Sequence, residues 1–321
     1  MPLQIVKMKI LVTGAVGFIG SHTAERLHNL GHEVIALDSF NDYYSLDLKH
    51  LNAKALTEKG ITILKKNLCD SNFAEDLPND FNYIFHFAAQ PGISQSSTFE
   101  DYLSNNVIAT KNLVDFALSC SDLNLFVNIS TSSVYGLVAT FTEDEAPKPA
   151  SYYGVTKLAG EQLVLQKSRE AYMKACSLRL YSVIGPRERP EKMYTKLISL
   201  GLKGKPFPLF EGSDKHLRSF TYVEDIVDGI VSVIGKEDIV NKEAINLGTE
   251  VEHTTKEGIE AVEKVLGKSI ELNIIPKRPG DQSRTKANID KARKLLNYNP
   301  KTTLLEAVQK QVDWYKANFT N

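Results

Sequence analysis

Residues 9–20 read Lys9-Ile-Leu-Val-Thr-Gly-Ala-Val-Gly-Phe-Ile-Gly20, an apolar run that leads into a turn with a glycine at every third position. Gly14 permits the tight turn, Gly17 lets the backbone approach a pyrophosphate with no Cβ between them, and Gly20 allows a helix to pack closely on the strand. The N-terminus of that helix offers free N–H groups and a positive dipole end to phosphate oxygens. The stretch therefore predicts a dinucleotide-binding strand–turn–helix unit.

Asp38 follows a second apolar strand, predicted at Val34–Leu37. A carboxylate at this separation from the glycines typically binds a ribose diol. It repels a 2′-phosphate, which favours NAD over NADP as the cofactor. The alternative is a glycine-rich turn in another kind of α/β protein, and the strand–helix–strand context with a terminal acid disfavours it.

Apolar segments suited to strands recur along the first half of the chain and alternate with helical patterns near residues 19–30, 98–119 and 154–173. Nearly unbroken apolar strands between helices are typical of a parallel sheet that is covered on both faces. We therefore predict an α/β fold with a Rossmann-type, doubly wound parallel sheet. The expected strands are Ile10–Val12, Val34–Leu37, Ile61–Leu64, Tyr83–Phe87, Leu125–Ile129 and Cys176–Leu180.

The alternation of strands and helices ends near residue 182, where Gly and Pro begin to cluster. Two capping boxes, Thr254 with Glu257 and Thr303 with Glu306, predict two helices further along. We expect a smaller, mixed α/β C-terminal lobe over the carboxyl ends of the sheet strands. The expected NAD-binding domain comprises 1–181 with 218–248 returning to it, and the expected substrate lobe comprises 182–217 and 249–321.

The composition excludes several classes of partner. The 321 residues include 38 basic and 39 acidic side chains, a net charge of −1 that gives no field to attract nucleic acid or an anionic membrane. Cys69, Cys120 and Cys176 are odd in number and lack metal-ligand spacing, which indicates reduced thiols and no metal site. No apolar run has transmembrane length, and no signal peptide is visible. We expect a cytoplasmic protein.

Hydroxyl side chains gather where one strand ends, in Asn128-Ile-Ser-Thr-Ser-Ser-Val-Tyr-Gly136. Ligands of doubly wound sheets bind at the carboxyl ends of the strands. A later helix carries Tyr153 and Lys157 four residues apart, and therefore on one face. The alternative is a solvated tyrosine–lysine pair on the surface, which the preceding glycine motif and hydroxyl cluster disfavour.

Tyr153 is the expected general base. A phenol has an ordinary pKa of about 10, which is too high for a base at neutral pH. We expect the Lys157 ammonium and a positively charged nicotinamide ring to favour the phenolate and so to lower this pKa. Thr131 can bridge the phenolate and a substrate hydroxyl, whereas Tyr152 is out of register with Lys157 and is expected to pack or to position.

The chain resembles, over nearly its whole length, the extended short-chain dehydrogenase/reductases of the nucleotide-sugar epimerase/dehydratase family. The resemblance rests on the glycine spacing, on the Tyr153–Lys157 pair, and on the segments His86-Phe-Ala-Ala-Gln90 and Asn105-Asn-Val107. It implies NAD as the cofactor. The NAD-binding residues that it implies are Gly14, Gly17, Phe18, Ile19, Gly20, Asp38, Asn41, Asn67, Leu68, Phe87, Ala88, Ala89, Gln90, Asn105, Ser130, Tyr153, Lys157 and Tyr181.

Arg218 and Arg278 stand in segments that resemble the two diphosphate clamps of the family. Arginine suits this role because its planar fork matches two phosphate oxygens. The alternative for each is a surface ion pair with a nearby acid. The resemblance implies a UDP-sugar substrate bound by Thr131, Ser132, Ser182, Arg189, Arg218, Arg278 and Asp281.

Ser132 and Ser133 narrow the reaction that the resemblance implies. Nucleotide-sugar 4,6-dehydratases carry an Asp-Glu pair before Val-Tyr-Gly, UDP-glucuronate decarboxylases usually carry a Glu there, and GDP-mannose 3,5-epimerases need a Cys in this stretch. With Thr131, Tyr153 and Lys157 as the proton-transferring groups, the simplest chemistry is oxidation and re-reduction at C4 of the sugar. We expect an isomerase, a 4-epimerase that acts through a transient 4-keto sugar.

Ser182 and Arg189 decide the expected sugar. UDP-galactose 4-epimerases usually carry Asn where Ser182 stands, whereas Ser182 followed by Arg189-Pro-Glu191 resembles the UDP-glucuronate 4-epimerases. On that resemblance Arg189 faces the sugar carboxylate, and the prediction is conversion of UDP-glucuronate to UDP-galacturonate. The alternatives are a UDP-glucose/UDP-galactose or N-acetylhexosamine 4-epimerase, a nucleotide-sugar reductase or decarboxylase, and a non-enzymatic NAD sensor, which the complete catalytic set disfavours.

The family also implies a homodimer. Helices near 98–119 and 154–173 are expected to pair with their symmetry mates across an isologous interface. Nucleic acid and membrane are not expected as partners.

Overall fold

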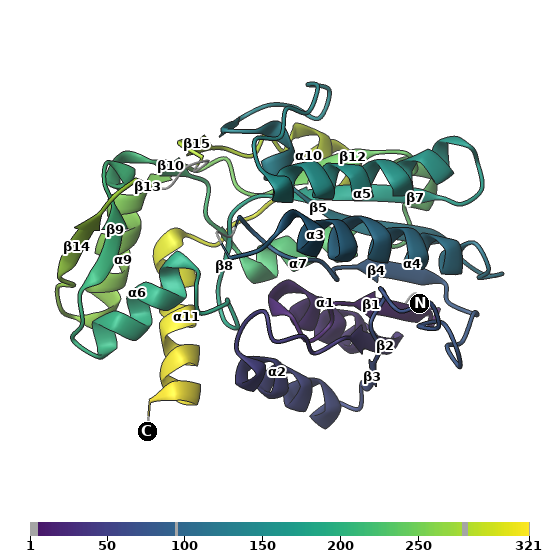
Figure 1. Ribbon diagram of the computed structural model, residues 1–321, viewed down its shortest axis with the longest axis horizontal. Coiled ribbons are helices and arrows are strands. Elements are labelled where there is room, and N and C mark those ends of the chain that lie inside the picture. Colours follow the sequence, from purple (N-terminus) through teal and green to yellow (C-terminus); the bar gives the residue numbers. More distant parts are fainter. Residues whose placement is uncertain (1–5, 94–95, 278–281, 321) are drawn as a thin grey trace, which may run out of the picture.

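Seven strands form a parallel sheet at the centre of the molecule (Figure 1). The computed structural model describes residues 6–93, 96–277 and 282–320. The strands of this sheet are β1 (Lys9–Thr13), β2 (Glu33–Asp38), β3 (Thr62–Lys65), β4 (Tyr83–His86), β5 (Leu125–Thr131), β7 (Ala175–Leu180) and β12 (Ala244–Leu247). Their order is β12-β7-β5-β4-β1-β2-β3, and each neighbouring pair is parallel.

The strand order confirms the predicted doubly wound sheet. From β1 the chain proceeds outward to β2 and β3, and then returns to β4 and proceeds outward on the other side. The direction therefore reverses between β1 and β4, at the point where such sheets leave a crevice for a ligand. The glycine turn lies directly at this point, because it follows β1.

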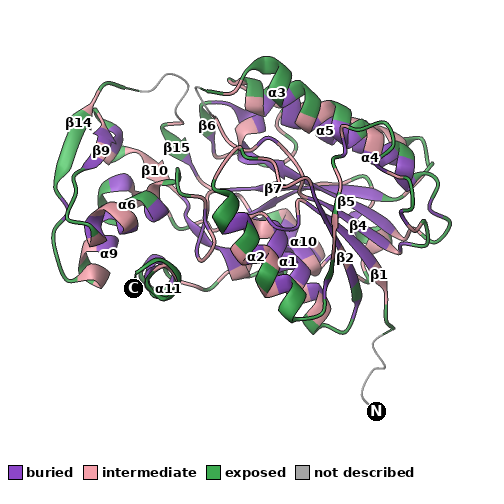
Figure 2. Cartoon of the chain, turned by 60° about the horizontal axis from the view of Figure 1, so that its bottom comes forward, coloured by how far each residue is buried: buried purple, intermediate pink, exposed green. Residues whose placement is uncertain are grey.

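The strands are buried on both faces because their side chains alternate between two apolar clusters. Ile10 and Val12 of β1 belong to the cluster on one face, and Leu11 belongs to the cluster on the other. Figure 2 shows the central strands in the colour of buried residues. The helices that contribute to the first cluster are α1 (Phe18–Asn29), α2 (Leu46–Glu58), η2 (Ser132–Tyr135), α7 (Val223–Val231), α8 (Glu237–Val240) and α10 (Asp290–Leu296). Those of the second are α4 (Ala109–Ala117) and α5 (Tyr152–Arg169).

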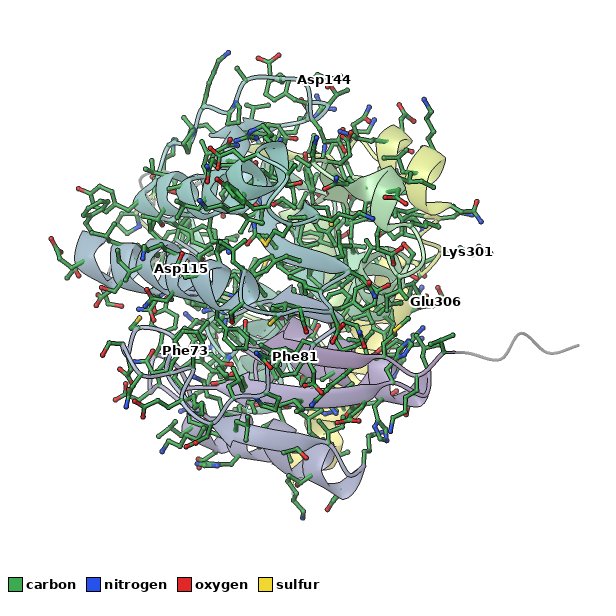
Figure 3. All side chains as sticks on the ribbon, turned by 90° about the vertical axis from the view of Figure 1, so that its right-hand side faces the viewer. Phe73, Phe81, Asp115, Asp144, Lys301 and Glu306 are labelled. Atoms are coloured by element: carbon green, nitrogen blue, oxygen red, sulfur yellow. The ribbon has the colours of Figure 1, made fainter. Side chains whose placement is uncertain are left out.

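The second face also carries an aromatic group beside α4. Phe116 makes edge-to-face contacts with Phe73 and Phe81, with ring centroids 5.9 and 6.2 Å apart. Figure 3 labels both phenylalanines beneath the helix that carries Asp115. These rings hold α4 against the sheet through the segment that precedes β4.

A π-helical turn interrupts the helix predicted near 98–119. This region consists of α3 (Phe99–Leu103), the π-helical turn η1 (Ser104–Ile108) and α4 in direct succession. Single π-turns inside helices occur frequently at functional sites. Gly160 of α5 packs against the turn so closely that a Cβ would lie 2.7 Å from the Asn106 carbonyl oxygen. The other two predicted helices correspond to α1 and α5.

The smaller lobe contains short strands from distant parts of the chain, and its helices form the group at the left of Figure 1. One sheet has the order β13-β10-β15-β6, and the pairs β14-β9 and β11-β8 complete the set. The strands are β6 (Val138–Ala139), β8 (Val183–Ile184), β9 (Phe207–Phe210), β10 (Leu217–Arg218), β11 (Thr221–Tyr222), β13 (His253–Thr254), β14 (Leu272–Ile275) and β15 (Arg284–Thr285). The helices of this lobe are α6 (Met193–Leu202), η3 (Ser213–Lys215), α9 (Thr255–Leu266) and α11 (Leu304–Phe319). The two short helices η2 (Ser132–Tyr135) and α8 (Glu237–Val240) contribute to the apolar cluster of the large domain.

Both predicted capping boxes begin helices of this lobe. The Thr254 side chain accepts a hydrogen bond from Glu257 N at the start of α9, and the Thr303 side chain accepts one from Glu306 N at the start of α11. In each case the glutamate side chain accepts from the capping threonine's backbone N–H. The sequence therefore located the two helix starts correctly.

Two segments belong to a different lobe from the one predicted for them. The expected return of 218–248 to the large domain agrees with β12, which pairs with β7, but Arg218 belongs to β10 in the lobe sheet. The prediction placed all of 249–321 in the smaller lobe, whereas Ile289, Ala292 and Leu296 around α10 belong to the apolar cluster of the large domain. The chain passes between the lobes more often than a simple division suggests.

Candidate active site

The glycine turn forms a cradle that is lined by backbone. Gly14 has a φ of 67°, and a Cβ there would lie 2.6 Å from Ala88 N. A Cβ on Gly20 would lie 2.3 Å from Gly14 O, so both positions exclude a side chain. A Cβ on Gly17 would lie 3.7 Å from the Tyr44 hydroxyl, on the side where a ligand would approach the helix N-terminus. This cradle fits a dinucleotide diphosphate.

Asp38 is held in place at the end of β2. Its Oδ2 accepts a hydrogen bond from Val16 N at 3.2 Å, and its Oδ1 accepts one from Phe40 N at 2.9 Å. Burial raises the pKa of this carboxyl, while these N–H donors and the nearby Lys49 act in the opposite direction. The carboxylate therefore has a fixed orientation beside the cradle, as the binding of a ribose diol requires.

A cavity of about 690 Å³ extends from the cradle to the smaller lobe and contains most of the predicted site. Predicted cofactor residues in its lining are Gly14, Gly17, Phe18, Ile19, Gly20, Asp38, Asn41, Asn67, Leu68, Phe87, Ala88, Ala89, Asn105, Ser130, Tyr153, Lys157 and Tyr181. Predicted substrate residues in its lining are Thr131, Ser132, Ser182, Arg189 and Arg218. Arg278 and Asp281 lie outside the described residues.

Gln90 does not line the cavity, in contrast to the prediction. Its backbone N–H donates to Asn106 Oδ1 at 2.8 Å, and its side chain donates to Ser97 Oγ at 2.9 Å. The side chain is buried behind the cavity wall, where it supports the segment that follows β4. These hydrogen bonds give Gln90 a structural role in the segment that follows β4.

Thr131, Tyr153 and Lys157 converge on the cavity from two adjoining elements. Thr131 is the last residue of β5, and Tyr153 and Lys157 lie one turn apart in α5. The first turn of α5 packs directly on η2, because a Cβ on Gly154 would lie 2.6 Å from Ser133 O. This close contact brings the phenol beside the threonine hydroxyl.

Burial raises the pKa of Tyr153 above its ordinary value, whereas the Thr131 hydroxyl and the Arg189 guanidinium act in the opposite direction. Lys157 is itself buried, and this lowers the pKa of its ammonium to about 8 although the carboxylate of Glu161 opposes the change. Among the protein's own groups the net effect on the pKa of Tyr153 is therefore upward, because desolvation exceeds the contributions of Thr131 and Arg189.

Glu161 is a buried residue that the sequence analysis missed. It lies one turn beyond Lys157 and forms an ion pair with Arg179, with Oε1 and Nη2 2.6 Å apart. Arg179 Nη1 donates to the Tyr135 hydroxyl at 2.8 Å, and Tyr135 donates to Asn246 Oδ1 at 3.0 Å. The network ties α5 to β7, η2 and β12 beneath the catalytic residues. The four-residue spacing from Lys157 to Glu161 was the available signal.

A second missed network supports the opposite wall through His86. The ring nitrogens of His86 lie 2.8 Å from Thr13 Oγ1 and 3.0 Å from Thr110 Oγ1. Complete burial lowers the pKa of this imidazole to about 3, so it is neutral. Asn106 in the π-turn donates to Thr156 Oγ1 at 3.0 Å and so connects the wall to α5.

Asn105 and Asn106 have different roles. The predicted residue, Asn105, lines the cavity and donates to Asp101 O at 2.9 Å. Its neighbour Asn106 is almost fully buried and bonds both polar backbone groups of Gln90. The first can contact a ligand, and the second holds the wall.

Hydroxyl and guanidinium groups that the sequence assigned to the substrate line the cavity together. Ser132 follows β5 and Ser182 follows β7, so the two hydroxyls stand at the carboxyl ends of neighbouring strands. Arg189 extends from the loop after β8, and Arg218 lies on β10.

The described cysteines form no disulfide, and no group of three or more potential metal ligands occurs in 6–93, 96–277 and 282–320. No helix in these same ranges is both long and apolar enough to cross a membrane.

Comparison with known sequences places this site in a family context. Residues 10–248 match the sequence family described as the NAD dependent epimerase/dehydratase family. An uncharacterized UDP-glucose epimerase of Bacillus subtilis (strain 168) is 37% identical, over 97% of this chain and 99% of the relative. UDP-glucuronate 4-epimerase 4 of Arabidopsis thaliana is 32% identical, over 97% of this chain and 76% of the relative.

Solved structures give the same result. The UDP-glucuronic acid 4-epimerase from Bacillus cereus, in complex with UDP-glucuronic acid and NAD, superposes with a TM-score of 0.91 at 34% identity, over 97% of this chain and all of that one (100%). MoeE5 in complex with UDP-glucose and NAD superposes with a TM-score of 0.86 at 31% identity, over 97% and 100% of the two chains. The similarity therefore extends through both lobes.

Proposed function

The chain belongs to the NAD dependent epimerase/dehydratase family, and from this premise we propose that it is an NAD-dependent 4-epimerase that interconverts UDP-glucuronate and UDP-galacturonate. One observation carries the reaction type. Thr131, Tyr153 and Lys157 meet at the cavity wall, and the residues that follow Thr131 are serines rather than carboxylic acids. At this strand end Tyr153 is thus the base for one reversible proton transfer, and serines stand where an elimination would need a further acid and base.

In the proposed reaction the C4 hydroxyl of the sugar loses a proton and C4 loses a hydride, which gives a 4-keto sugar. A bound NAD, for which the glycine cradle and Asp38 are suited, would supply the hydride acceptor and donor for the two opposite faces of C4. Tyr153 Oη takes the proton, directly or through Thr131 Oγ1, and gives it back to the new C4 alkoxide. Protons and hydride therefore balance over one turnover, with no net consumption of cofactor.

Lys157 has two proposed tasks in this cycle. Its ammonium stabilises the Tyr153 phenolate and is the group that would hold the cofactor ribose. Because burial works against the phenolate in the protein's own field, the positive charge of an oxidised nicotinamide ring would supply the remaining stabilisation. Proton abstraction is thereby favoured when the oxidised cofactor is in place.

The uronate preference is supported by three residues that line the cavity. Arg189 offers a charge-assisted contact to a sugar carboxylate, and Ser132 and Ser182 offer hydroxyl donors. Oxidation of a uronate at C4 gives a β-keto acid, which loses CO₂ readily. If the carboxylate is held away from the geometry for C–C cleavage, the keto intermediate keeps its CO₂. The contacts to the carboxylate therefore prevent decarboxylation as well as contribute to affinity.

A UDP-glucose/UDP-galactose 4-epimerase is the second candidate function, because the relative from Bacillus subtilis has the name UDP-glucose epimerase. The test is parallel incubation with UDP-glucuronate, UDP-glucose and UDP-N-acetylglucosamine, with products resolved by NMR. Efficient turnover of UDP-glucose alone would replace the uronate proposal by this second candidate. Release of CO₂ as the main outcome would indicate a decarboxylase instead, and net consumption of NAD(P)H would indicate a reductase.

A homodimer is the proposed assembly. Apolar side chains are exposed along α3, η1 and the start of α5, where Tyr152 and Val155 are 61% and 44% exposed. The Phe99 and Tyr152 rings are in contact, with centroids 5.3 Å apart, so the patch is continuous across the helices. A second copy of the same helices would bury it across a two-fold axis. Sedimentation at micromolar concentration tests this assembly.

A cytoplasmic location stays a prediction from the sequence.

A further inference from the structure

Three consecutive residues of the loop between β8 and α6 point in three different directions. Arg187 extends to α1 of the large domain, Glu188 is hydrogen-bonded to helices of the smaller lobe at the edge of the cavity lining, and Arg189 lines the cavity. Because this loop contacts both lobes and the cavity within three residues, a shift of either lobe would move the side chain that lines the cavity.

Glu188 anchors the middle of this loop. Its carboxylate is buried, and Oε2 accepts hydrogen bonds from Thr195 N at 3.2 Å, from Thr195 Oγ1 at 3.0 Å and from Gln311 Nε2 at 2.8 Å. Thr195 lies in the first turns of α6, and Gln311 lies in α11. A buried carboxylate is costly unless its oxygens are hydrogen-bonded, and here the donors come from two helices. The contacts fix the loop to the smaller lobe.

Arg187 fixes the same loop to the large domain. Its Nη2 donates to Glu25 Oε1 of α1 at 2.8 Å. Its φ is 69°, a left-handed conformation that residues other than glycine adopt only when their surroundings impose it. The left-handed turn reverses the direction of the backbone, so that the next side chain, Glu188, points into the other lobe.

Arg189 lies across the cavity against the segment that follows Asp38. Its Cζ is 5.8 Å from the ring centroids of both Tyr43 and Tyr44. The Tyr44 hydroxyl stands 3.7 Å from the position of a Cβ on Gly17, so this ring lies beside the glycine cradle. Lys49 Nζ lies 4.8 Å from the Tyr44 ring centroid. The arginine and the two tyrosines all line the cavity, and their contacts join the loop to the wall beside the cradle.

We propose that Arg187, Glu188 and Arg189 form a brace between the two lobes, in which the buried Glu188 is the positioning residue that holds Arg189 against Tyr43 and Tyr44 and thereby retains the cofactor. The proposal rests on the proposed function only in taking NAD(H) as the occupant of the cavity. An enzyme that removes and returns one hydride has to keep the reduced cofactor through every turnover. Slow dissociation of NADH is the property that the brace supplies.

The experiment measures NADH dissociation by the loss of its fluorescence after displacement with excess NAD⁺, without any sugar present. Glu188→Ala and Arg189→Ala are each expected to raise the dissociation rate about tenfold, because each removes the same contact with the tyrosines. The double variant is expected to release NADH no faster than Arg189→Ala alone, since Glu188 acts through Arg189. Glu188→Gln keeps an acceptor oxygen and is expected to retain the cofactor nearly as the parent does.

Glu306→Ala is the matched control. Glu306 completes the capping box at the start of α11, the helix that carries Gln311, and is labelled in Figure 3. Its loss weakens the same helix without touching the brace, so NADH dissociation is expected to stay at the parental rate. An equal acceleration in Glu306→Ala, or multiplying effects in the double variant, would overturn the positioning role. If Glu188→Ala does not fold, Gln311→Met removes one donor to the same carboxylate and is expected to accelerate release in the same direction.

Failure of the brace and failure of the proposed function give different results. Unchanged NADH release in all variants, together with normal epimerisation by the parent, would overturn the brace alone. Accelerated release in a protein that epimerises no UDP-sugar would overturn the proposed function and leave the brace standing.

Discussion

The two walls of the cavity place charged side chains beside the same ligand, but they are built in different ways. One wall takes its residues from regular elements, with Thr131 at the end of β5 and Lys157 in α5. The other takes Arg189 from an irregular loop whose position depends on a few hydrogen bonds to Glu188. On the proposed function, chemistry resides on the rigid wall and retention of ligands on the loop. Substitutions on the first should abolish turnover, whereas those on the second should shift binding.

The largest effect is expected for Tyr153→Phe on the rigid wall. Loss of a positioned general base typically lowers turnover ~10²–10⁴-fold, while cofactor and UDP-sugar binding stay nearly unchanged. Tyr152→Phe is the matched control, because Tyr152 is its exposed neighbour and does not line the cavity. Initial rates and binding titrations check both variants, and parental turnover in Tyr153→Phe would remove Tyr153 from the role of base.

Glu161→Gln tests how the rigid wall is stabilised. The substitution leaves the buried Arg179 guanidinium without its ion-pair partner, which typically costs ~3–5 kcal/mol of unfolding free energy. Asp115→Asn breaks the surface pair with Lys111 and is expected to cost less than about 1 kcal/mol. Urea denaturation measures both, and similar losses in the two variants would contradict the importance of the buried network.

Arg189→Ala tests the loop wall through substrate choice. A charge-assisted hydrogen bond to a carboxylate contributes ~1.5–3 kcal/mol, so kcat/KM for UDP-glucuronate is expected to fall about tenfold or more, mainly through KM. Any neutral-hexose turnover is expected to change less, because a neutral hexose lacks that carboxylate. A parallel decline for both sugars would show that Arg189 supports the site without recognising the uronate.

The smallest expected effect is a pH dependence that His86 imposes on stability. Burial lowers the pKa of His86 from 6.5 to about 3, so the unfolded chain binds a proton below pH 6.5 that the folded chain does not bind. The contribution of His86 to stability is therefore complete above pH 6.5 and is lost as the pH decreases toward about 3. The Glu224 carboxyl, whose pKa is lowered from 4.5 to about 2, changes the stability mainly below pH 4.5. Urea denaturation between pH 6.5 and 4.5 should give a shallower slope for His86→Gln than for the parent, and equal slopes would refute the assignment.

The fold and the rigid wall could be predicted because their signals are periodic and local. Alternating apolar strands and helices give the parallel sheet, and a spacing of four residues places Tyr153 and Lys157 on one helix face. The capping boxes at Thr254 and Thr303 mark helix starts for the same reason. Local geometry is sufficient in each of these cases.

The remaining features depend on contacts between distant residues. Glu188 resembles an ordinary loop acid until Gln311, more than a hundred residues further along, is placed beside it. The raised pKa of Tyr153 follows from burial, which the spacing to Lys157 does not reveal. The π-turn at Ser104–Ile108 leaves the apolar pattern of its helix intact, so periodicity could not detect it. Gln90 was assigned to the cavity by its motif, although its side chain turns to Ser97 instead.

Conversion of UDP-glucuronate in D₂O tests the central claim most directly, because removal and return of the same hydride at C4 leaves solvent no access to carbon. Purified protein with bound NAD is expected to produce UDP-galacturonate whose carbon positions carry no deuterium, as read by ¹H NMR and mass spectrometry. Incorporation of deuterium at a ring carbon, or loss of CO₂ in place of the epimer, would contradict it.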